Sequence, residues 1–115
     1  MKQQNGDLIQ LANDGMFDVI IHGCNCFCTM GAGIAAAIRD QFPEAFRADL
    51  ETPMGDRQKL GAYSMAKVKR GDNFLTIVNG YTQYHYSGQP PLVDYDAVRL
   101  LFSKIRIDFG GTRIA

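Results

Sequence analysis

The residues best suited to chemistry in this chain lie between an apolar run and a segment that favours a helix. Three polar side chains, those of His22, Asn25 and Thr29, come directly after the apolar run, and Gly31 and Gly33 follow them. Glycine lacks a Cβ, so the backbone there can approach a ligand closely and adopt positive φ. The free N–H groups of a following helix attract anions. The segment therefore predicts a phosphate-binding loop; the alternative is a tight turn that only packs a helix on a strand.

The elements around this loop predict an α/β fold. A buried strand is expected at 17–22 and a helix at 34–42, and ligands of open α/β sheets bind where strands end and helices begin. Pro43 ends the first helix and can start a second. Asp94 is an expected N-cap, and Gly110 follows the last helix. We expect strands at 2–11, 17–22, 63–69 and 74–81, a turn at 70–73, and helices at 34–42, 43–50 and 94–109, the last with a buried stripe of Val98, Leu101, Phe102, Ile105 and Phe109.

Length and charge limit the classes of function. The chain has 115 residues and a formal net charge of zero, which fits a single domain and argues against a nucleic-acid backbone as the main partner. No apolar run is long enough to span a membrane, and the first residues contain no secretory signal. We therefore expect a cytoplasmic protein without a membrane partner.

Three cysteines lie within five residues, at Cys24, Cys26 and Cys28. An odd number of closely spaced cysteines is no disulfide framework, and in a reducing compartment they are expected to stay reduced. Their spacing differs from that of zinc sites, so we expect no metal. The cysteines are interpreted as small apolar fillers around the loop; Cys28 would be sensitive to oxidation if it were exposed.

Three segments together resemble the macro domain, an ADP-ribose-binding family. They are Gly6-Asp7-Leu8, Asp18-Val19-Ile20-Ile21-His22-Gly23-Cys24-Asn25 and Gly31-Ala32-Gly33-Ile34-Ala35. The amino-acid sequence of these segments is most similar to the branch that processes ADP-ribose 1″-phosphate and to the branch that removes ADP-ribose from glutamate. The resemblance implies a three-layer α/β/α fold with a mixed central sheet, formed by residues 1–115 as one partial macro domain. It implies no cofactor.

The resemblance also implies roles for individual residues. Asp7 would accept a hydrogen bond from the adenine amino group, and Asn25 would lie near the distal ribose. The diphosphate would lie against the backbone of Gly31, Ala32, Gly33 and Ile34. His22 would be the catalytic residue, with a structural, hydrogen-bonded histidine as the alternative. The remaining expected ligand contacts are Leu8, Cys24, Met30 and Tyr81, and Tyr84 or Tyr86 can stack on the adenine or cover a ribose, unless this aromatic stretch only extends a strand.

The sequence departs from the family pattern after Thr112. A strand begins there, but the second glycine-rich loop and the last strand and helix of macro domains are missing from these residues. An incomplete sheet exposes apolar surface and invites self-association. Three functions remain open: a hydrolase acting on ADP-ribose 1″-phosphate or an ADP-ribosyl ester, a module that binds ADP-ribose or ADP-ribosylated protein without turnover, and a self-associating fragment without activity.

Overall fold

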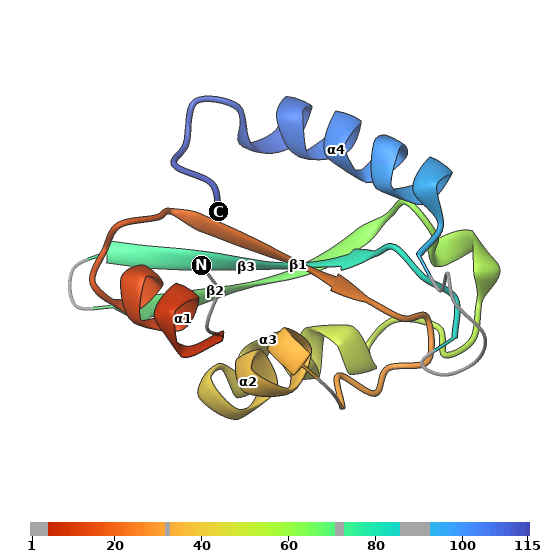
Figure 1. Ribbon diagram of the computed structural model, residues 1–115, viewed down its shortest axis with the longest axis horizontal. Coiled ribbons are helices and arrows are strands. Elements are labelled where there is room, and N and C mark those ends of the chain that lie inside the picture. Colours follow the sequence, from red (N-terminus) through yellow and green to blue (C-terminus); the bar gives the residue numbers. More distant parts are fainter. Residues whose placement is uncertain (1–4, 32, 71–72, 86–92) are drawn as a thin grey trace.

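The computed structural model describes residues 5–31, 33–70, 73–85 and 93–115, excepting the side chains of residues 5–8 and 70. In these residues a mixed three-stranded sheet lies between two layers of helices (Figure 1). Helix α4 covers one face, and α1, α2 and α3 cover the other. The elements are α1 (Asn5–Asn13), β1 (Val19–Cys24), α2 (Gly33–Gln41), α3 (Pro43–Leu50), the 3₁₀ helix η1 (Arg57–Lys59), β2 (Tyr63–Arg70), β3 (Asn73–Tyr81) and α4 (Tyr95–Phe109).

The sheet has the order β1-β3-β2, with β3 in the centre. Strand β3 runs parallel to β1, with His22 opposite Asn79, and antiparallel to β2. The turn expected at 70–73 includes residues 71 and 72, which lie outside the described residues. At the start of β1, Val19 also forms an isolated parallel bridge with Ile114. The predicted mixed sheet between helix layers is confirmed.

The strand expected at 2–11 is wrong over residues 5–11, which belong to helix α1, and residues 2–4 lie outside the described residues. Ile9 and Ala12 are buried while Leu11 between them is 40% exposed. This spacing of three is helical, whereas a strand would alternate with a period of two. Gly15 at φ 80° follows the helix, with its N–H bonded to the Ala12 carbonyl.

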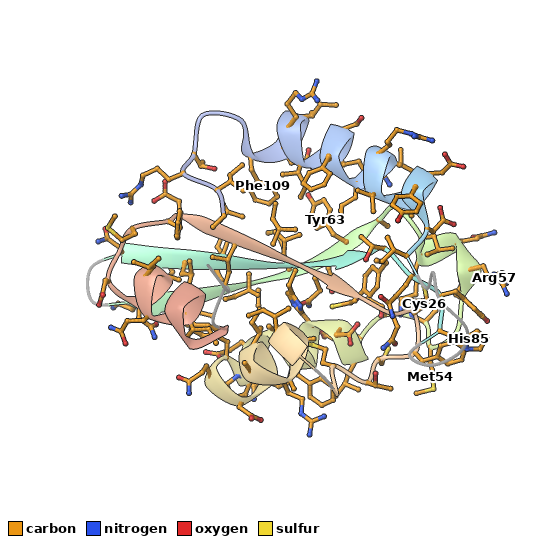
Figure 2. All side chains as sticks on the ribbon, in the orientation of Figure 1. Cys26, Met54, Arg57, Tyr63, His85 and Phe109 are labelled. Atoms are coloured by element: carbon orange, nitrogen blue, oxygen red, sulfur yellow. The ribbon has the colours of Figure 1, made fainter. Side chains whose placement is uncertain are left out.

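Side chains on opposite faces of the sheet form two apolar clusters. Ile20, Ile77 and Tyr81 pack towards α1, α2 and α3, whereas Val19 and Val78 pack towards Leu101 and Ile105 of α4. The expected stripe of α4 is wrong at Phe102, which is 52% exposed. Ala97 takes a buried place instead, because positions 97, 101 and 105 are spaced by four residues and align on one helix face. Figure 2 shows Tyr63 and Phe109 between the sheet and α4.

No helix in the described part of the chain has the length and apolar character needed to cross a bilayer.

Candidate functional site

A cavity of about 660 Å³ opens beside the loop that joins β1 to α2. It lies where β1 ends, and the end of parallel β3 is its neighbour in the sheet. Open α/β sheets bind their ligands at this edge. The described lining residues are Gly23, Cys24, Asn25, Thr29, Met30, Gly31, Gly33, Ile34, Ala35 and Gln83.

The first half of the loop is held by the Asn25 side chain. Its Oδ1 accepts from the Phe27 N–H at 2.7 Å, and its Nδ2 donates to Thr29 Oγ1 at 2.7 Å. An asparagine that bonds the backbone two residues ahead forms a turn by itself. Asn25 therefore shapes the cavity wall in addition to lining it.

The second half of the loop contains residues in the left-handed backbone region. Cys28 has φ 61°, Met30 has φ 43° and Gly33 has φ 59°. Left-handed residues spaced along a loop turn peptide N–H groups into concave surfaces that suit anions. For Cys28 and Met30 this conformation costs of order 1 kcal/mol or more, so surrounding contacts must hold it.

Lys59 supplies one of these contacts from η1. Its Nζ donates to the Cys26 carbonyl at 3.0 Å and lies 3.6 Å from Cys28 Sγ. On the other side of Cys28, the Sγ donates to the Asp49 carbonyl of α3 at 3.2 Å. The loop is thus fixed from two elements that are distant in sequence.

The start of α2 leaves room for a ligand. A Cβ built on Gly33 would meet no atom within 4 Å, and one built on Gly31 would only reach the Thr29 carbonyl oxygen at 3.9 Å. The first turn of α2 has no acidic residue, so its N–H groups face no local negative charge from that turn. This end of the helix can accept an anion through backbone N–H groups and the helix dipole.

The structure brings together most of the loop residues that the sequence indicated. Cys24, Asn25, Met30, Gly31, Gly33 and Ile34 all line the cavity. The side chains of Asp7 and Leu8, and the whole of Ala32, lie outside the described residues. Thr29, which the sequence singled out as a polar residue of the loop, also lines the cavity, and the expected ligand contacts omitted it together with Gly23, Ala35 and Gln83. Gln83 could have been found, because it follows β3, which ends at the same edge as β1.

His22 lies elsewhere, on the face of the sheet that α1, α2 and α3 cover. It is 4% exposed, and its Nε2 donates to Asn79 Oδ1 at 2.6 Å. Asn79 Nδ2 in turn donates to the Ala45 carbonyl and to Ser64 Oγ, which fixes the orientation of the amide. Burial lowers the pKa of His22, although the Asn79 hydrogen bond raises it in part. The ring is therefore a neutral part of a buried polar network.

Tyr81 is also placed in the core and not in the cavity lining. It is 1% exposed, and its hydroxyl is 2.7 Å from both Ser64 Oγ and Asp49 Oδ1. Burial raises the pKa of the Tyr81 phenol, and the neighbouring Asp49 carboxylate adds to this shift. Burial also raises the pKa of Asp49, opposed by Tyr81 and Lys59.

Aromatic and cationic side chains gather near the cavity, at the edge where Figure 2 labels Cys26, Met54, Arg57 and His85. Phe27 and His85 are stacked with centroids 5.1 Å apart, and the Arg57 guanidinium lies 3.8 Å from the Tyr84 ring centre. The Tyr84 hydroxyl donates to the Gly55 carbonyl. Tyr84 is therefore engaged within the protein, and Tyr86 lies outside the described residues.

All three cysteines are buried and free, which confirms their interpretation as small fillers. Cys28 is 6% exposed, so it is not the exposed thiol that the sequence hypothesis assumed. Within the described ranges, no three or more His, Cys, Asp or Glu side chains are grouped so that they could hold a metal ion.

Comparison of the sequence with known proteins finds a relative in a bacteriophage. The sequence is 39% identical over 100 residues to an uncharacterized 17.5 kDa protein in the tk-vs intergenic region of Enterobacteria phage T4, covering 85% of this chain and 61% of the phage protein. The chain thus spans about three fifths of the length of the phage protein. No protein-family model matches the chain.

Solved structures give the class of fold. The macrodomain of Mycobacterium tuberculosis DarG superposes with a TM-score of 0.57 at 23% identity, over 80% of this chain and 60% of that one. A protein of unknown function from Bacteroides thetaiotaomicron superposes with a TM-score of 0.62 at 23% identity, over 77% of this chain and 57% of that one. The chain therefore has a macrodomain-like fold.

Proposed function

We propose that this protein binds ADP-ribose, or a molecule that contains it, in the cavity beside the β1–α2 loop. The observation that carries the proposal is the cavity itself, with the left-handed loop and the start of α2 on its wall. Its macrodomain-like fold supports the choice of ligand.

The chemistry of the lining fits an anion with sugar groups. Asn25, Thr29 and Gln83 offer neutral polar groups for ribose hydroxyls, and backbone N–H groups can bind a diphosphate without lysine or arginine. Met30 and Ile34 add apolar surface. A protein that carries ADP-ribose is the partner that we propose on the same grounds.

Hydrolysis of ADP-ribose 1″-phosphate or of an ADP-ribosyl ester is a finer hypothesis, which comes from the sequence resemblance. General acid–base catalysis needs a titratable group within hydrogen-bond reach of the substrate. Among the described lining residues only Cys24 is titratable, and burial raises its pKa further. Binding without turnover is therefore the function that the described geometry supports best, and the catalytic role of His22 stays a prediction.

Calorimetry with ADP-ribose on Gly31→Glu and Gly31→Gln tests the binding proposal. The two side chains have the same size, and Gly31 has space for a Cβ, so only the charge differs between the variants. If the loop binds a diphosphate, Gly31→Glu should weaken binding by at least about tenfold relative to Gly31→Gln. Equal affinities would contradict the anion site.

Tyr81→Phe is the control for a residue in the core. It removes a hydroxyl that bonds Ser64 and Asp49, so the free energy of unfolding should fall by about 1–3 kcal/mol. The affinity of the folded variant for ADP-ribose should be unchanged, because Tyr81 is absent from the described cavity lining. A loss of affinity for ADP-ribose without a loss of stability would indicate that Tyr81 contacts the ligand.

A further inference from the structure

Cys28 and Lys59 form a buried thiol–amine pair that the ligand site does not use. The Nζ of Lys59 lies 3.6 Å from the Sγ of Cys28, and each residue is 6% exposed. The two residues are 31 positions apart, one on the β1–α2 loop and one on η1. This distance between Nζ and Sγ is close to the separation of reacting atoms that are aligned for a reaction, which is about 3–3.5 Å.

The surrounding contacts hold both groups in this arrangement. Lys59 Nζ donates to the Cys26 carbonyl, and Cys28 Sγ contacts the Asp49 carbonyl and Thr52 Oγ1. Cys28 is absent from the described lining of the cavity, and its Sγ lies against these partners instead. The pair is thus built into the fold and does not depend on a mobile surface side chain.

The other two thiols lie in different surroundings. Cys24 Sγ is 3.7 Å from the His22 ring, and Cys26 Sγ donates to the Gln83 carbonyl. Burial raises the pKa of both thiols and so disfavours their reactive thiolate forms. Of the three thiols, Cys28 is the one that the Lys59 amine contacts.

We propose that Cys28 and Lys59 are an oxidation site at which hydrogen peroxide creates a covalent sulfenamide cross-link. First, the Cys28 sulfur attacks peroxide: an S–O bond forms, the O–O bond breaks and water leaves, so the thiol is oxidised to a sulfenic acid. Next, the Lys59 amine, having released its proton to solvent, attacks that sulfur. An S–N bond forms, the S–O bond breaks and the oxygen leaves as a second water. One peroxide is reduced for each link, and thiol reductants reverse it.

Mass spectrometry of the folded chain after peroxide treatment tests the proposal. The cross-linked product should be lighter than the starting protein by about 2 Da, since the two hydrogens lost are not replaced by oxygen. Proteolysis should then yield one linked peptide pair that contains Cys28 and Lys59, and dithiothreitol should separate it. A gain of about 16 or 32 Da on Cys28 without a linked pair would overturn the proposal.

Matched variants identify the two reacting groups. Lys59→Arg keeps a cation that can bond the Cys26 carbonyl but lacks the amine, and it should give sulfenic acid on Cys28 with no link. Cys26→Ser alters the neighbouring thiol and should leave the link in place. A link that persists in Lys59→Arg would overturn the assignment. The wild-type peptide map alone decides the question if a variant fails to fold. The cross-link does not depend on ADP-ribose binding, so the two proposals fail independently.

Discussion

The roles of His22 and Tyr81 depend on the partners that each side chain meets in the buried polar network. His22 follows an apolar strand, and its sequence position suits either a catalyst or a structural residue. Its ring donates to Asn79, 57 positions away, and Asn79 reaches on to α3 through the Ala45 carbonyl. No local pattern in the sequence indicates such partners. Tyr81 is similar, because Asp49 and Ser64 are brought to it by the fold.

The buried His22 ring makes stability depend on pH. Burial lowers the pKa of His22 in the folded state below its ordinary value of about 6.5. The unfolded chain therefore binds a proton first as the pH falls, and stability present above about pH 6.5 is lost below it. The free energy of unfolding from urea titrations should fall between about pH 7 and pH 5 in the wild type and much less in His22→Gln.

His85 provides the matched control for this experiment, because it is the second histidine of the chain and is exposed. His85→Gln should retain the pH dependence of the wild type. If His22→Gln and the wild type lose stability in parallel, the buried imidazole is not the group responsible.

Most elements could be predicted from patterns within the chain, and α3 was predicted with the observed bounds. Its start is marked by Pro43 at the first helical position. Helix α1 could not be predicted with the same rules, because its short mixed sequence follows no strict hydrophobic period. The helix is established only by the packing of Ile9 and Ala12 in the core. Phe102 was misplaced for a related reason, since a smaller residue, Ala97, faces the sheet.

Helix α4 provides a test at this scale through its N-cap. Asp94 Oδ1 accepts from the Ala97 N–H at 3.0 Å, as the sequence predicted. Asp94→Ala should lower the free energy of unfolding by about 0.5–2 kcal/mol, measured by urea denaturation. Asp96→Ala is the control, because it removes the same charge from the first turn and loses only an exposed pair with Arg99. Equal losses in the two variants would contradict a specific capping role.

At the scale of the whole molecule, the described chain is closed by contacts between its last residues and β1. Ala115 N–H donates to the Val19 carbonyl, and Ile21 N–H donates to the Ala115 carbonyl. Arg113 pairs with Asp18 through its guanidinium and its backbone N–H. The sequence indicated a strand beginning here; its partner could be established only from the three-dimensional arrangement.

The Asp18–Arg113 pair should control how firmly this segment is held. The hydrogen bonds from Arg113 lower the pKa of Asp18, so the pair contributes above about pH 4 and is lost as the pH falls through the lowered value. In Asp18→Asn, the amide protons of Ile21 and Ala115 should exchange faster at neutral pH, measured by NMR. Asp14→Asn removes an exposed charge of the same sign nearby and should leave both rates unchanged. Unchanged rates in Asp18→Asn would contradict the role of the pair.

The facing positions of His22 and Asn79 have a consequence for how the strands find their alignment. The two residues are direct register partners in the parallel β1–β3 pair. The two pairs before it, Ile20 opposite Ile77 and Ile21 opposite Val78, are apolar and similar in size, so they discriminate poorly between alignments shifted along the strand. A shift would leave an imidazole and an amide buried without partners, at a cost that apolar contacts do not impose. The polar pair therefore favours the observed alignment of β1 and β3, because alignments shifted along the strand lose this hydrogen bond.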